Sequence, residues 1–227
     1  KWLYDHPNSY RDVAQYHQLD TTHGAVSYNT VNSGGSQSFK MNSIVSFKDV
    51  TPGAGATTLI YIAKKQLERN YDVVAIEVDK HDFMYFDEEK MYSVSSNEIG
   101  NAIAKHSDAE VILIDANTSP AVEALANETI YLLEPSKIQL NKLLARDPKV
   151  LERNRNKKIV LNQCLLSDQD VADFEYESRS KVYFNIPYLD DKLDNNHVLN
   201  ELLIKMGFAR LDDDNSEKGG KLFSIFK

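Results

Sequence analysis

Short apolar runs alternate with amphipathic segments over most of the chain. The apolar runs predict strands at residues 43–47, 73–79, 109–116, 129–135, 157–164 and 181–188. Helical periodicity predicts helices at residues 57–70, 97–105, 137–145 and 197–206. The run AEVILIDA is unbroken, which is typical of a strand buried on both faces of a parallel sheet. Strands that alternate with helices at this spacing predict an α/β fold with a doubly wound, mostly parallel sheet and helices on both faces.

Both ends of the sequence depart from this pattern. Residues 1–42 lack periodicity and end in the Ser/Gly/Asn-rich stretch NTVNSGGSQSFK, which predicts a linker or an N-terminal extension. Because the sequence begins with Lys1 and not with Met, we expect a missing upstream domain. Residues 43–208 are predicted to form the folded domain. Residues 209–227 are predicted to form an acidic tether followed by the short amphipathic tail KLFSIFK.

Composition narrows the function classes. The 227 residues include 26 Lys and Arg against 34 Asp and Glu, a net charge of -8, so broad non-specific DNA binding is disfavoured and no strong nucleic-acid signal is present. Cys164 is the single cysteine, so this sequence forms no internal disulfide and no cysteine-rich metal site. The sequence shows neither a long apolar run nor a signal peptide, and we expect a cytoplasmic protein.

The loop after the first predicted strand is the main candidate for chemistry. In FKDVTPGAGATTL, Gly53 and Gly55 allow the backbone to turn its N–H groups inward, and Thr57 and Thr58 open the helix. Such a loop can hold phosphate and place a Thr hydroxyl on magnesium. The P-loop pattern is incomplete because Ala56 stands where the phosphate lysine belongs. On this loop alone, a plain strand–helix turn explains the sequence equally well.

Five signals in order resemble the ParA/MinD family of deviant Walker-A ATPases, which are P-loop NTPases. TPGAGATT lies over the family loop KGGxGKT[ST], and Glu-Val-Asp-Lys-His follows the second strand where the family has D-x-D-P-Q. Asp-Ala-Asn-Thr ends the Walker B strand, Leu-Asn-Gln matches V-N-R, and Asn-Ile-Pro-Tyr matches the closing I-P-Y. The resemblance covers residues 43–206, which is most of the chain.

The resemblance implies ATP and Mg²⁺ as ligands. It implies that Asp79 positions the attacking water and that Asp115, with Thr57, holds magnesium. It implies an adenine contact at Asn162. The implied phosphate contacts are Gly53, Ala54, Gly55, Ala56, Thr57 and Thr58.

Two family lysines are absent from the loop. Ala56 replaces the lysine that reaches bound phosphate, and Thr51 replaces the signature lysine that reaches the dimer partner's nucleotide. Each lysine–phosphate contact contributes about 1.5–3 kcal/mol, so their loss lowers affinity by about two to four decades. The spacing of Lys48 and Lys80 does not favour either as a replacement. We therefore expect hydrolysis to be lost or very slow.

Plainer structural roles stay open for the same residues. Asp79 and Asp115 can each be a strand-end carboxylate bound to loop N–H groups, and Asn162 can tie its strand end to the neighbouring loop. Residues 82–89 mix carboxylates with aromatic side chains, which indicates either a helix packed on the sheet or a partner-binding surface.

Two functional hypotheses follow from the resemblance. The first is a degenerate, dimeric scaffold that positions a larger pilus, secretion, conjugation or partition machine with little or no ATP hydrolysis. The second is a working, atypical ATP-dependent dimerisation switch. The tail residues Leu222, Phe223, Ile225 and Phe226 are flanked by lysines, which suits either a peripheral membrane contact at the inner face of the cell membrane or packing on the domain itself.

Overall fold

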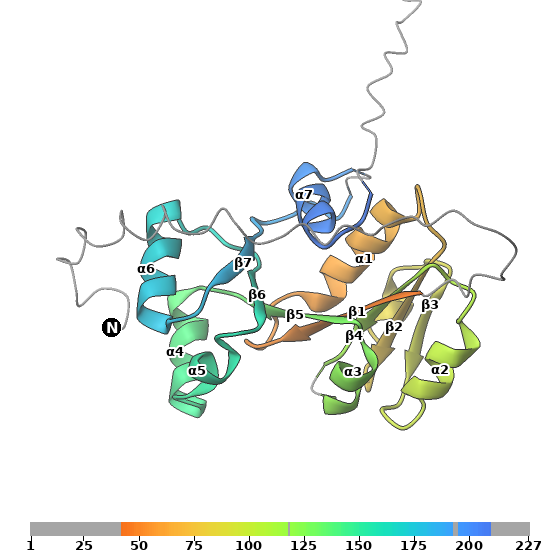
Figure 1. Cartoon of the computed structure of the whole chain (residues 1–227), viewed down its shortest axis with the longest axis horizontal. Helices are drawn as coiled ribbons and strands as arrows, with labels where there is room; N and C mark the ends of the chain where they lie inside the picture. Colours follow the sequence, from red (N-terminus) through yellow and green to blue (C-terminus); the bar gives the residue numbers. More distant parts are fainter. Residues whose placement is uncertain (1–41, 118, 193–194, 210–227) are drawn as a thin grey trace, which may run out of the picture.

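A computed structural model describes residues 42–117, 119–192 and 195–209 of the chain. Within these residues a seven-stranded sheet has the order β3-β2-β4-β1-β5-β6-β7 (Figure 1). The strands are β1 (Ser43–Asp49), β2 (Val73–Val78), β3 (Met91–Val94), β4 (Val111–Asp115), β5 (Glu128–Leu133), β6 (Lys158–Leu161) and β7 (Val182–Asn185). The helices are α1 (Ala56–Leu67), α2 (Ile99–Lys105), α3 (Pro120–Leu125), α4 (Lys137–Arg146), α5 (Val150–Asn154), α6 (Asp168–Ser178) and α7 (His197–Lys205), with a 3₁₀ turn, η2 (Phe83–Tyr85).

All pairings between the described strands are parallel, which confirms the predicted parallel sheet. Strand β1 lies at the centre, paired with β4 on one side and β5 on the other. Strands β2 and β3 follow β1 in the sequence and lie on one side of it, where β4 later inserts between β1 and β2. Strands β5, β6 and β7 then follow on the other side of β1. The carboxyl end of β1 is therefore the switch point of the sheet, where ligands bind in open α/β folds.

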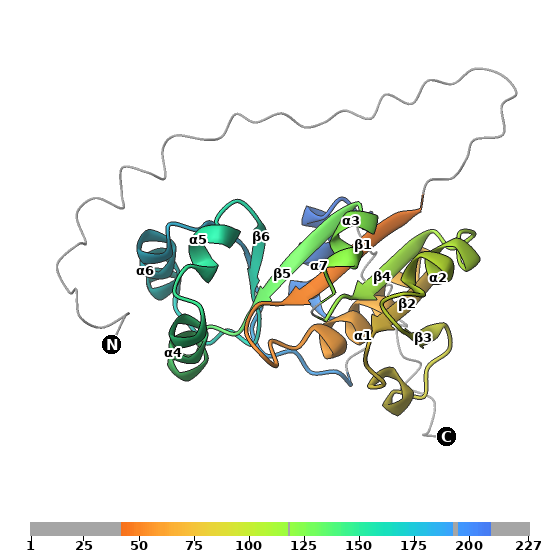
Figure 2. The same ribbon diagram turned by 90° about the horizontal axis from the view of Figure 1, so that it is seen from below.

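Helices cover both faces of the sheet, as the unbroken apolar strands predicted (Figures 1 and 2). Helices α1 and α7 pack on one face, where Leu59 and Leu202 meet alternate strand residues such as Val73 and Leu113. Helices α2 to α6 pack on the other face in two buried clusters. Because successive side chains of a strand point to opposite faces of the sheet, neighbouring residues of one strand pack in different clusters. The predicted doubly wound α/β fold is confirmed.

Four elements were not predicted from the sequence, and one of the two alternatives for residues 82–89, the packed helix, is wrong. Strand β3 and helices α3, α5 and α6 were not predicted, because they are short or carry few apolar residues. The segment 82–89 contains only the 3₁₀ turn and not a packed helix. Phe83 is buried there, whereas Met84 and Tyr85 are 69% and 80% exposed.

Several predictions concern residues outside the described part of the chain. They include the extension at residues 1–41 and the tail residues Leu222, Phe223, Ile225 and Phe226. The predicted domain limits remain predictions. None of the helices among the described residues is both long and apolar enough to cross a membrane.

Candidate functional site

The loop between β1 and α1 has the compact turn that its glycines predicted. Gly53 and Gly55 have φ values of +73° and +93°, and α1 begins directly after Gly55. Ala54 and Ala56 are buried in the core between the sheet and α1. The loop therefore turns its backbone N–H groups toward the end of β1 while its small side chains pack inward.

A carboxylate of the chain itself lies against these N–H groups. The N–H of Ala56 donates to Asp49 Oδ1 at 3.2 Å, and backbone hydrogen bonds from Ala56 and Gly55 lower the pKa of this carboxyl group. Burial and the neighbouring charge of Asp115 outweigh them and raise the pKa of Asp49 to about 6. The backbone of the loop thus binds an anion that β1 supplies. Asp49 was not among the predicted site residues, although its place two residues before Thr51, where the glycine-rich segment begins, was the available signal.

The predicted magnesium residues are brought together at the ends of their elements. Thr57 Oγ1 donates to Asp115 Oδ2 at 2.7 Å, and Asp115 is fully buried at the end of β4. Lys80 Nζ lies 3.1 Å and 3.0 Å from the two oxygens of Asp115 and 3.4 Å from Thr57 Oγ1. The N–H of Asn117 donates to Asp115 Oδ1 at 3.2 Å. Both oxygens of the buried carboxylate are therefore held by donors of the protein.

Lys80 reaches this position because of a buried carboxylate that precedes it. Glu77 on β2 is fully buried and accepts hydrogen bonds from the N–H groups of Asp82 and Phe83, each at 3.1 Å. It also accepts from Ser93 Oγ on β3 at 2.5 Å. These bonds fix the turn after β2. This turn brings the ammonium group of Lys80 over the sheet edge onto Asp115 and Thr57. The expectation that Lys80 does not replace the phosphate lysine of the loop stays a prediction.

The predicted water-positioning residue, Asp79, is hydrogen-bonded to Ser96 and not to the residues of the loop. It directly follows β2 with φ of +54°, and its carboxylate accepts hydrogen bonds from the N–H of Ser96, at 2.9 Å, and from the Ser96 hydroxyl. These bonds lower the pKa of Asp79. The arrangement matches the structural role of a strand-end carboxylate.

Asn162, the predicted adenine contact, braces the loop. Its Nδ2 donates to the carbonyl oxygen of Ala54 at 2.7 Å, and its side chain is buried. A Cβ added at Gly55 would lie 2.9 Å from Asn162 Nδ2 and 2.9 Å from Gln163 Nε2. The left-handed backbone conformation thus favours glycine here, and a Cβ would in addition force the two side-chain amides to shift.

Thr51, which stands in place of the signature lysine, points into the protein. It is fully buried, and its hydroxyl accepts a hydrogen bond from the N–H of Glu134 at 2.8 Å. This bond ties the start of the loop to the end of β5. Thr51 therefore anchors the loop, and its side chain is not accessible to solvent.

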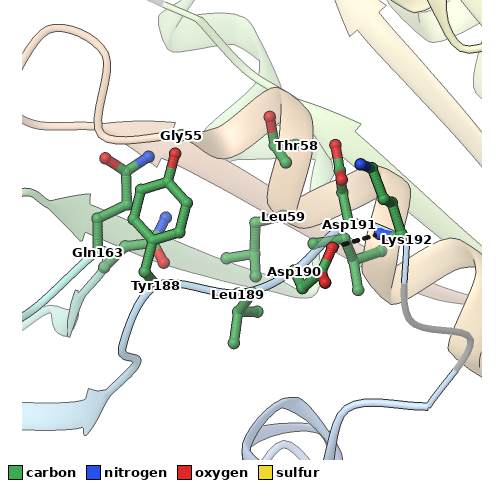
Figure 3. Close-up of a pocket in the computed structure, with 11 residues that line it drawn as sticks. Gly55, Thr58, Leu59, Gln163, Tyr188, Leu189, Asp190, Asp191 and Lys192 are labelled. Atoms are coloured by element: carbon green, nitrogen blue, oxygen red, sulfur yellow. Dashed lines mark hydrogen bonds between the residues drawn. The ribbon is translucent and has the colours of Figure 1, made fainter.

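A pocket of about 490 Å³ opens beside the loop (Figure 3). Thr58 and Leu59 of α1 form its floor, Gln163 and Tyr188 lie on one side, and Asp190, Asp191 and Lys192 lie on the other. The remaining lining residues are Gly55, Ile62, Asn162 and Leu189. Two exposed carboxylates at the rim oppose the approach of a polyphosphate.

The residues present do not fit a magnesium ion in this arrangement. The ammonium group of Lys80 lies against both Thr57 and Asp115, which are hydrogen-bonded to each other, and takes the position beside them that a cation would need. Among the residues that the structure describes, no group of three or more His, Cys, Asp or Glu side chains could hold a metal ion.

Comparisons with known proteins support the fold. No protein-family model and no curated protein matches the sequence. A ParA family ATPase from Chlorobium tepidum TLS matches with a TM-score of 0.51 and 13% identity, over 67% of this chain and 86% of that chain. The MinD cell division protein of Aquifex aeolicus aligns with a TM-score of 0.44 and 15% identity, over 64% and 82% of the two chains. The first likeness shows that this chain shares the fold of a ParA family ATPase.

Proposed function

We propose that this protein is a nucleotide-independent member of the ParA/MinD-like fold class that acts as a localisation or assembly scaffold. Its partners are protein components of a larger machine, such as a pilus, secretion, conjugation or partition assembly, and a second copy of the chain. The proposal includes weak or no ATP hydrolysis.

One observation supports the nucleotide-independent part of this proposal. Asp115, the residue expected to hold magnesium, is fully buried and has both oxygens engaged by Lys80, Thr57 and Asn117. An incoming Mg–nucleotide would have to displace these donors, and the loop offers no lysine to compensate. Transition-state charge on a transferred phosphoryl group would lack its usual stabilisation.

Calorimetric titration of ATP and ADP with magnesium into the purified chain tests the proposal. We expect no binding heat up to millimolar nucleotide and an oligomeric state in sedimentation that does not change with nucleotide. Micromolar binding by the wild-type chain would refute it. Circular dichroism on the same sample confirms that a negative result comes from folded protein.

The pocket beside the loop favours a second candidate, the atypical ATP-dependent switch. Its volume of about 490 Å³ and its contact with Gly55 and Thr58 suit a nucleoside. In this case Asp79 acts on the attacking water, and Thr57 and Asp115 hold magnesium after Lys80 has moved away. ATP turnover that disappears in Asp79→Ala would support the switch and remove the scaffold proposal.

The C-terminal tail provides a separate contact in this proposal. Leu222, Phe223, Ile225 and Phe226 with their flanking lysines suit weak docking on an anionic membrane or on a protein partner. Dimerisation would strengthen such docking by doubling the tails. Co-sedimentation with anionic vesicles tests the membrane contact, with Phe223→Ser as the variant that loses it.

A further inference from the structure

Three charges surround the loop and are supplied by three different strand ends. Asp49 ends β1, Asp115 ends β4, and Lys80 follows β2. Lys80 bonds to both oxygens of Asp115, and the charges of Lys80 and Asp115 both act on Asp49. Such a loop in an open α/β sheet would otherwise present empty backbone N–H groups and a free carboxylate at its switch point.

We propose that Asp49 and Lys80 are built-in occupants of this site. The Asp49 carboxylate fills the anion position of the loop, and the Lys80 ammonium group fills the cation position beside Thr57 and Asp115. The site is thereby closed to external phosphate and to divalent cations. This inference rests on the proposed nucleotide-independent function and names the residues that impose it.

The chemistry of the anion position supports this assignment. The N–H of Ala56 donates to Asp49 Oδ1 at 3.2 Å, and the neighbouring N–H of Gly55 also lowers the pKa of this carboxyl group. A carboxylate oxygen accepts the same donors that a phosphate oxygen would accept. Because Asp49 belongs to the chain, it competes with a phosphate without any cost of association.

The chemistry of the cation position points the same way. The Lys80 side chain is 21% exposed, whereas that of Asp115 is completely buried, so the ammonium group covers the carboxylate from the solvent side. The Asp115 carboxylate and the Thr57 hydroxyl are oxygen ligands of the kind that magnesium prefers. Removing only the ammonium group would therefore leave Asp115 and Thr57 as a vacated cation site.

The first experiment removes the cation occupant. Lys80→Met is titrated with MgCl₂ alone, with ionic strength matched by KCl, while the melting temperature is recorded. We expect the melting temperature to rise by about 3–6 °C when magnesium is at ten times its dissociation constant, whereas that of the wild type stays constant. Lys48→Met is the matched control, because Lys48 is also a partly buried lysine paired with a carboxylate, Glu123, and should give no magnesium response.

The second experiment removes the anion occupant. Asp49→Ala is titrated with inorganic pyrophosphate without metal, and we expect its affinity to exceed that of the wild type at least about tenfold, because a repelling carboxylate leaves the cradle. Asp72→Ala makes the same change in net charge at an exposed pair with Lys90, so it should give no gain.

The two experiments separate this inference from the proposed function. Micromolar ATP binding by the wild-type chain would refute the proposed function. Folded Lys80→Met that shows no magnesium response, together with folded Asp49→Ala that gains no pyrophosphate affinity, would refute the assignment of Asp49 and Lys80 as occupants. If Lys80→Met does not fold, Lys80→Gln keeps a neutral polar group at the same place and gives the same test. A magnesium response of equal size in Lys48→Met would also overturn the proposal.

Discussion

Replacing Gly55 by alanine tests the loop conformation on which the closed site depends. Its φ of +93° is a left-handed value, which costs a residue with a Cβ about 1–2 kcal/mol. The new methyl group would also lie 2.9 Å from Asn162 Nδ2 and from Gln163 Nε2. Crowding of this kind in a packed site costs about 1–3 kcal/mol. We therefore expect Gly55→Ala to lower the free energy of unfolding by about 2–5 kcal/mol.

Urea denaturation followed by circular dichroism measures this loss, and Gly53→Ala is its matched control. Gly53 has φ of +73° but no atom within 4 Å of an added Cβ, so it should lose only about 1–2 kcal/mol from the backbone. Gln163→Ala should recover part of the loss in the Gly55→Ala background, because it removes one crowding amide. Equal losses at the two glycines, without recovery in the double variant, would refute the close packing of Gly55 on the end of β6.

Three further predictions address the surroundings of the loop. Because the pKa of Asp49 is raised from 3.8 to about 6, the folded state holds its proton longer, so this group's contribution to the free energy of unfolding falls as pH rises from about 4 to 6. The difference between wild type and Asp49→Asn across this window should reach up to about 3 kcal/mol in urea melts, and a flat difference contradicts the burial of the carboxylate. Thr51→Val leaves the Glu134 N–H unpaired and should cost about 1–3 kcal/mol, measured against Thr58→Val at an exposed position. Asn162→Ala releases the carbonyl of Ala54 and should cost a similar amount, with faster amide exchange in the loop as the readout; unchanged exchange would argue against the brace.

Much of the fold could be predicted from the sequence because its main signals are local. A strand buried on both faces needs an unbroken apolar run, and Val111–Asp115 carries one. Helices that cover a sheet need one apolar stripe, which α1, α4 and α7 show. Edge strand β3 has four residues and is half exposed, so its pattern is too weak. Helix α6 carried one usable signal, the Ser167 and Asp170 capping box at its start.

In the candidate site too, local features could be predicted from the sequence, whereas contacts between distant residues could not. Gly53, Gly55 and Thr57 mark a turn at a helix start, which is a local feature, and the sequence determined it. Lys80 and Asp115 are far apart along the chain, and their ion pair exists only because β2 and β4 are neighbours in a parallel sheet. The direction of Lys80 depends further on Glu77, which holds the following turn. Parallel strands bring their carboxyl ends to one edge, so the tertiary structure alone decided that the chain's own charges meet at the loop.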